Sequence, residues 1–346
     1  MFDRIPAQTL RLLILLAVFA GVVLFFAAVI DGYLNARLFN RISTSVAIIA
    51  LIATGQAFVV LTRNIDLSVG SVVGCVAYFV GGLLALWPGM PPLAVALLAV
   101  LIGAGFGAVN GFLVARFGLP SIIVTLATLA IFRSILVQSS DGASITTDSL
   151  PAWVPGFAQA NAFTLGELQL RWMVVVTLVV VLAAHLFLTR LRAGRRFFAI
   201  GSNPDAARFA GIDAARTVFL AFVISGALAG LAGFMFLSRF GNITVVAGLG
   251  FELKSVGAVV VGGVNIFGGS GNVIGVLVGA ALIDLIDTSL VRWELVSEFW
   301  REAVLGLLIL AAVVADALLS RRLMARRRRA AAGAAAAAPA IGEGRT

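Results

Sequence analysis

The most informative polar side chains of this chain stand inside long apolar stretches, where each one is costly to bury. Asp284 and Asp287 lie three residues apart in "GAALIDLIDTSL", so on a helix they share one face. That face either lines a polar path or approaches the membrane interface near Arg292, and the interface is the favoured interpretation. The other candidates to line a path are Gln56, Asn110, Thr125, Asn265 and Phe267.

A polar interruption separates two apolar stretches at "TRNIDLSVG", residues 62–70. A helix is expected to begin near Leu67, where the Asp66 carboxylate can accept hydrogen bonds from free N–H groups and face the positive end of the helix dipole. Asn64, Asp66 and Ser68 are therefore predicted to cap a tight turn between two membrane-spanning helices. A gate at the inner mouth of a path is the alternative.

The stretch "NPDAARFAGID" has the pattern of a short helix with defined ends. Its Asn and Pro suit a helix start, and its glycine suits a helix end. The small alanines leave a smooth face that can fit a groove on a partner protein, whereas a solvated connection between two spans, the alternative, needs no such defined ends. The residues of this predicted docking helix are Asn203, Pro204, Asp205, Ala206, Ala207 and Gly211.

Motifs for nucleotide and metal chemistry are missing from the sequence. There is no G-x-x-x-x-G-K-[ST] loop, and the nearest stretch, "GLGFELKS", lacks the glycine before Lys254. The glycine run at 262–275 does not match G-x-G-x-x-G and is better explained as a break between two short helices. With one histidine and one cysteine, His185 and Cys75, we expect no metal site, no cofactor and no enzymatic activity.

The composition places these groups in a membrane. Of the 346 residues, 61% are hydrophobic and 12% are charged, about half the charged fraction of a soluble domain. The apolar residues form blocks of roughly 17 to 25, the length of a helix that crosses the bilayer core. The predicted fold is therefore all-α, a polytopic membrane helix bundle of about ten transmembrane helices.

The segment 254–267 is the weakest of these spans, because it is short enough to be re-entrant instead. Small residues at every fourth position, as in Gly103, Gly107 and Gly111, predict helices that pack closely in lipid. Two further rows are Gly226 with Gly230 and Gly275 with Gly279. The spans are expected at 10–30, 44–62, 69–87, 92–115, 120–137, 172–188, 217–237, 254–267, 273–290 and 303–319.

The placement of arginines predicts the orientation. The loop 189–217 holds six arginines and is expected to be cytoplasmic, whereas the loop 138–170 holds none and is expected outside. Ten crossings then place both termini in the cytoplasm. Residues 1–320 are predicted to form the membrane domain. Residues 321–346 are predicted to form a basic, low-complexity tail, whose arginines contact anionic lipid rather than nucleic acid.

Four stretches, in this order, carry a resemblance to a known family. They are "NIDLSVGS" (64–71), "GAVNGFLVARFGLPSIIVTLATLAIFR" (107–133), "GSNPDAARFAGI" (201–212) and "GLGFELKSVGAVVVGGVNIFGGSGNVIGVLVGA" (248–280). Over about residues 10 to 320 the chain resembles the permease subunits of bacterial ABC importers for monosaccharides. These are of the ribose, xylose, arabinose and rhamnose type, which also includes autoinducer-2 permeases.

The resemblance implies a permease in the bacterial inner membrane that forms the path for a pentose, a hexose or a deoxyhexose such as rhamnose. It implies three partners: an ATP-binding subunit that hydrolyses ATP, a periplasmic sugar-binding protein, and a second permease subunit, identical or closely related. "DAARFAG" matches the E-A-A-x-x-x-G pattern of the loop that fits onto the ATPase, with Asp205 in the acidic position.

Other functions stay open beside this one. Autoinducer-2 import and nucleoside import belong to the same class. An ion-coupled secondary transporter would use Asp284 and Asp287 as cation sites, and an intramembrane enzyme would need a histidine paired with a nucleophile. The two aspartates stand where many relatives have small or amide residues, so the identity of the solute does not transfer from any one relative.

Overall fold

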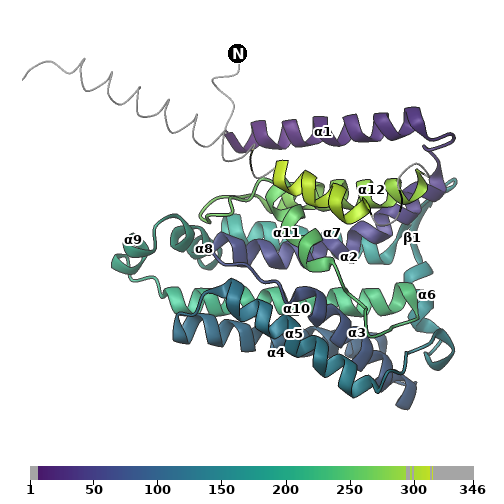
Figure 1. Ribbon diagram of the computed structural model, residues 1–346, viewed down its shortest axis with the longest axis horizontal. Coiled ribbons are helices and arrows are strands. Elements are labelled where there is room, and N and C mark those ends of the chain that lie inside the picture. Colours follow the sequence, from purple (N-terminus) through teal and green to yellow (C-terminus); the bar gives the residue numbers. More distant parts are fainter. Residues whose placement is uncertain (1–6, 294–296, 298–299, 312–313, 315–346) are drawn as a thin grey trace, which may run out of the picture.

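The computed structural model describes residues 7–293, 297, 300–311 and 314. The described chain forms a bundle of helices, with one small antiparallel hairpin at its edge (Figure 1). In chain order the elements are α1 (Ala7–Val29), α2 (Ala36–Leu61), α3 (Val69–Leu86), α4 (Pro92–Phe117), α5 (Ser121–Ser140), η2 (Thr147–Ser149), α6 (Trp153–Gln159), β1 (Asn161–Leu165), β2 (Leu168–Arg171), α7 (Trp172–Arg190), α8 (Arg192–Ser202), α9 (Pro204–Phe209), α10 (Ala214–Phe240), α11 (Phe251–Val261) and α12 (Val273–Arg292).

Eight helices of the described chain are long and apolar enough to cross a membrane, namely α1 to α5, α7, α10 and α12. They coincide with eight of the predicted spans, so the polytopic helix bundle is confirmed. Residues 301–311 are helical and belong to the predicted span 303–319, whose second half lies largely outside the described residues. The predicted tail 321–346 lies outside them entirely.

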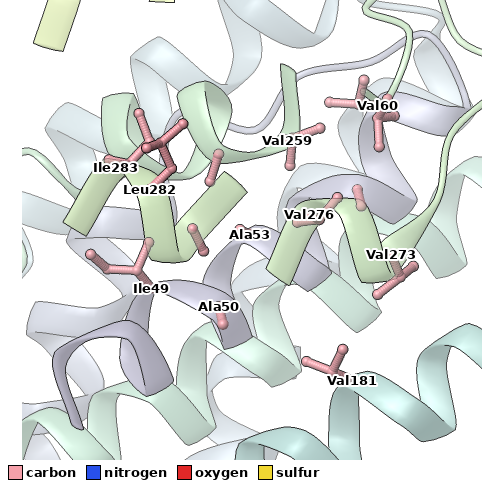
Figure 2. Packing of buried hydrophobic residues seen from close by; sticks show 14 of the residues in the cluster. Ile49, Ala50, Ala53, Val60, Val181, Val259, Val273, Val276, Leu282 and Ile283 are labelled. Atoms are coloured by element: carbon pink, nitrogen blue, oxygen red, sulfur yellow. The ribbon is translucent and has the colours of Figure 1, made fainter. Parts of the chain in front are cut away.

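Helix α2 forms the centre of the bundle. Every residue from Ala47 to Leu61 is buried, because α2 packs against α7, α10, α11 and α12. Figure 2 shows part of this core, with Ala50 and Ala53 of α2 near Val276 of α12. A helix that is buried on all sides has to be apolar all round, so the one amide on this stretch, Gln56, needs partners for its polar atoms.

The predicted glycine rows form close contacts between helices. A side chain added at Gly103 or Gly107 of α4 would meet the backbone of α10, and one added at Gly226 would meet the backbone of α4. The third row, Gly275 and Gly279 of α12, meets the end of α11 in the same way. These helices therefore pack backbone to backbone, which small residues allow in lipid.

The segment 254–267 is not a full span, and the alternative of a shorter segment describes it better. Helix α11 has 11 residues, which gives a length of about 16 Å, roughly half of the bilayer core. It follows an irregular run, residues 241–250, in which three glycines have a positive φ angle: Gly241, Gly248 and Gly250. These left-handed positions end the helical conformation, so α11 begins only at Phe251.

The irregular run and α11 together pass from the end of the bundle with α6 and β1 toward the end with α8 and α9 (Figure 1). Arg133 of α5 holds the run in place, because its Nη1 donates to the carbonyls of Val245 and Ala247 at 2.8 and 2.7 Å. Gly74 of α3 leaves room for the same Ala247 carbonyl. We call residues 241–261 the discontinuous crossing.

Candidate functional site

Polar side chains from four helices converge on residues 62–68, which we call the connector, between α2 and α3. Asp66 is 1% exposed and lies at its centre. Its Oδ1 accepts hydrogen bonds from the backbone N–H of Ser68 at 3.0 Å and from Ser68 Oγ at 2.7 Å. Its Oδ2 accepts one from Ser225 Oγ of α10 at 3.3 Å. Asn110 of α4 donates in turn to Ser68 Oγ at 2.7 Å.

These contacts correct the predicted cap. Helix α3 begins at Val69 rather than near Leu67, and Ser68, at its N-cap position, makes no side-chain capping hydrogen bond. Asp66 instead closes a turn just before the helix and is buried in the bundle. Asn64 bonds locally, donating to the carbonyl of Thr62 at 3.0 Å.

The backbone of the connector is held by side chains from neighbouring helices. In the amide orientation that satisfies both groups, Gln56 of α2 donates to the Asp66 carbonyl and accepts from the Asp66 N–H, each at 3.1 Å. On α5, Ser121 Oγ accepts from the N–H of Ile65 at 3.1 Å, and Thr125 Oγ1 donates to its carbonyl at 3.3 Å. Backbone groups that leave a helix inside a membrane protein need such partners.

Asp66 lies outside the spanning helices, and burial and hydrogen bonding shift its pKa in opposite directions. Burial raises the pKa of the Asp66 carboxyl, and the hydrogen bonds from Ser68 and Ser225 lower it again in part. Removal of this carboxylate would leave several buried donors without an acceptor.

The predicted path residues therefore separate into two groups. Gln56, Asn110 and Thr125 lie together around the connector and direct hydrogen bonds toward it. Asn265 and Phe267 lie apart from them, in the loop between α11 and α12, where Asn265 Oδ1 accepts from the N–H of Phe267 at 3.0 Å. Phe267 is 75% exposed.

The connector is also tied to the segment before α9. Arg63 Nε donates to the carbonyl of Gly201 at 2.6 Å, and its Nη2 donates to the carbonyl of Ser202 at 2.9 Å. Ser202 Oγ donates to the carbonyl of Gly269 at 3.1 Å, and the N–H of Gly269 donates to the carbonyl of Leu61 at 3.0 Å. These hydrogen bonds join the end of α2 to the end of α8 and to the loop after α11.

Helix α9 begins and ends at the residues that the sequence indicated. Asn203 Oδ1 accepts from the N–H of Ala206 at 3.0 Å, and Pro204 occupies the first turn. Gly211 follows the helix with a φ angle of 73°. Ala207 packs inward, whereas Phe209 is 91% exposed. Helix α9 therefore presents an aromatic side chain at the surface, two residues from the buried Ala207.

At the opposite end of the bundle, α2, α10, α11 and α12 surround a cavity of about 490 Å³ that contains Asp284 and Asp287. We call it the aspartate cavity. Ser45 Oγ donates to Asp284 Oδ1 at 2.8 Å. Asp287 pairs with Lys254 Nζ at 2.6 Å and with Arg301 Nε at 3.2 Å.

The aspartate face was predicted to line a path or to approach the membrane interface near Arg292, and the structure shows no bond between either aspartate and Arg292 among the described contacts. Arg292 donates to the carbonyl of Gly32 at 3.2 Å, while the two aspartates line the aspartate cavity. Ser225, Arg133 and Arg239 were not among the predicted site residues. Each is a polar side chain in an apolar block, so the rule that selected Gln56 could have found them.

Comparisons with known proteins agree with one another. Residues 38–313 match the family described as the permease component of the branched-chain amino acid transport system. The chain is similar to the "Autoinducer 2 import system permease protein LsrC" of Yersinia enterocolitica, with 37% identity over 306 residues, covering 88% of this chain and 81% of the relative. For the protein of the same name from Enterobacter sp. (strain 638) the identity is 38% over 285 residues, covering 82% and 80%. No solved structure matches.

Proposed function

Because this chain belongs to the family of permease components of branched-chain amino acid transport systems, we propose that it forms the translocation path of an ATP-driven importer for a small solute. It is a multi-pass protein of the inner membrane and a transport subunit rather than an enzyme. The finer proposals concern the solute, the partners and the residues that couple them.

The observation that carries the mechanism is the bond between Arg63 and Gly201, which joins the connector to the end of α8, just before the exposed helix α9. We propose that α9 docks on an ATP-binding subunit, with Phe209 entering a groove of that partner. Closure of the two ATPase subunits then moves α9. Arg63 passes this motion to the connector, and Gly269 passes it to the loop that joins α11 and α12.

The exposed side chains of the discontinuous crossing support a path that lies between this permease and a second subunit. Non-helical backbone at membrane depth is tolerated only inside protein or beside a water-filled cavity. Yet Val246 and Leu249, in its irregular part, are 61% and 66% exposed, and Leu253 of α11 is 58% exposed. A second permease subunit, identical or closely related, would cover this surface and leave the path between the two subunits.

A solute-binding protein would dock at the other end, on the surface formed by α6 and the β1–β2 hairpin. Figure 1 places this surface opposite α9. Residues 141–170, which follow α5, contain no arginine and fit the outer side, whereas the arginines of α8 fit the cytoplasmic side. In this arrangement the binding protein delivers the solute to the aspartate cavity.

Autoinducer 2 is the first candidate solute, because the relatives carry that solute in their names. A monosaccharide is the second candidate, because the four stretches that mark the sequence are shared with sugar permeases. Reconstitution tests both. The permease, its ATP-binding subunit and its binding protein are placed in proteoliposomes, and uptake of autoinducer 2, ribose and rhamnose is measured with and without ATP.

A further inference from the structure

Two buried polar atoms on the wall of the aspartate cavity have no hydrogen-bond partner within the described part of the chain. One is Oδ2 of Asp284, a residue that is 2% exposed, and the other is Nη1 of Arg239. Both residues line the cavity. Their other atoms are engaged, since Asp284 Oδ1 accepts from Ser45 and Arg239 Nη2 donates to the Arg41 carbonyl at 3.4 Å.

Two residues that line one cavity thus hold an acceptor and a donor that lack hydrogen-bond partners. A buried polar atom without a partner costs free energy, and neither atom bonds to the other among the described contacts. A molecule that supplies a donor to Asp284 and an acceptor to Arg239 would recover both costs at once.

We propose that the aspartate cavity is a recognition site for a small uncharged solute with at least two hydroxyl groups. Asp284 Oδ2 accepts a hydrogen bond from one hydroxyl group, and Arg239 Nη1 donates to a second hydroxyl or to a ring oxygen. The inference rests on the proposed transport function. It adds a place inside the permease where that solute binds and the two residues that contact it.

The charges of the cavity argue against simple ions. A cation would pair with Asp284, but it would meet four cationic side chains that line the same cavity, those of Arg41, Arg239, Lys254 and Arg301. An anion would pair with Arg239 and leave the Asp284 carboxylate without a donor. A hydroxyl group both donates and accepts, so a polyhydroxylated solute satisfies both atoms.

Asp287 also lines the aspartate cavity, but its role differs from that of Asp284. Its two oxygens are already paired, with Lys254 and with Arg301. The pair with Lys254 joins α11 to α12, so this aspartate fixes the position of the half-helix beside the cavity. It therefore shapes the site, while Asp284 and Arg239 contact the solute.

Chemical protection tests the site without relying on transport. Thr288 lines the cavity, and the only cysteine of the chain is Cys75. The full permease, assembled with its ATP-binding subunit in nanodiscs, carries Cys75→Ala and Thr288→Cys. The rate at which a small maleimide alkylates the cysteine at position 288 is measured without solute and with autoinducer 2, ribose or rhamnose. A matched variant carries Thr164→Cys, on exposed β1 and away from the cavity.

At least one of the three solutes is expected to slow alkylation at position 288 and leave position 164 unchanged. In the same background, Asp284→Leu, which removes the acceptor, and Arg239→Met, which removes the donor, should each raise the solute concentration for half-protection by about tenfold. Alkylation without solute should keep its rate, which shows that the variants retain the cavity.

Three results would overturn the proposal: protection at 288 by none of the solutes, protection by sodium chloride alone, and protection that Asp284→Leu leaves intact. Uptake is measured separately on the same variants. ATP-dependent uptake without protection would refute the recognition site and leave the transport function standing. Protection without uptake would support the site and refute the transport function.

Discussion

Arg63 Nε lies 2.6 Å from the carbonyl oxygen of Gly201, and this hydrogen bond joins the buried connector to the segment that carries α9. Arg63 holds a φ angle of 67°, a left-handed conformation that is unfavourable for a residue with a side chain. Gly201 has no room for a side chain, because a Cβ atom there would meet the carbonyl of Leu61. The close approach of the two segments therefore needs both residues.

Replacement of Arg63 is expected to uncouple ATP hydrolysis from transport. In Arg63→Ala both hydrogen bonds to the α8 carbonyls are lost, and hydrogen bonds from a charged donor contribute about 1.5–3 kcal/mol each. Uptake in proteoliposomes should fall at least about tenfold, while the ATPase subunit stays bound. Arg63→Lys should be intermediate, because lysine lacks the planar fork of arginine. Arg190→Ala, on the exposed end of α7, is the control, and an equal loss of uptake there would contradict this role.

Phe209→Ala is expected to weaken binding of the ATP-binding subunit. The side chain is 91% exposed, so its loss should leave the thermal stability of the permease unchanged. If it fills a pocket of the partner, binding should weaken by about tenfold, as for interface anchors that contribute more than about 1 kcal/mol. Phe163→Ala, an exposed aromatic residue at the hairpin end, should leave this binding unchanged. Normal ATPase binding by Phe209→Ala would exclude α9 as the main docking element.

Asp66→Ala should lower expression and thermal stability more than it changes solute preference. The change leaves the hydroxyl groups of Ser68 and Ser225 without their acceptor inside the bundle, a loss of about 2–4 kcal/mol. Asp66→Asn should cost less, because an amide oxygen still accepts. Thermal unfolding in detergent measures both variants against the exposed Asp148→Ala. A stable Asp66→Ala with altered solute preference would indicate a gating role instead.

Gly107→Ala should destabilise the bundle, because a methyl group there strikes the backbone of α10. Overpacking of this kind costs about 1–3 kcal/mol. Gly105→Ala lies two residues away on the same helix, with open space around its Cβ position. It should be neutral or slightly stabilising in the same unfolding experiment. Equal melting temperatures for the two variants would contradict the direct contact of α4 and α10.

The sequence predicted the spans well, because a helix that crosses a membrane must be long and apolar, and these properties can be read locally. It also indicated the ends of α9, since Asn203 and Gly211 suit a helix cap and a helix end. The predicted span 254–267 failed because its apolar residues fit an extended run or a half-helix equally well. Helix α11 ends at Val261, and Gly263, two residues later, has a left-handed conformation.

Local sequence patterns could not predict which helices contribute side chains to the connector. The hydrogen bond between Asp66 and Ser225 joins residues 159 positions apart, and no spacing in the sequence predicts which helix faces which. Gln56 and Asn265 looked alike as amides in apolar stretches, yet only Gln56 lies beside the connector. The rule that buried polar groups need partners selects candidates, and only the packing assigns their partners.

Uptake by the reconstituted importer is the most direct test of the central claim. Proteoliposomes that contain the permease, its ATP-binding subunit and its solute-binding protein should accumulate autoinducer 2 or a monosaccharide only when ATP is present on the side of α9. Removal of either partner, or Arg63→Ala, should reduce uptake to background. Uptake that continues without ATP or without the solute-binding protein would contradict the account and favour a transporter that works alone.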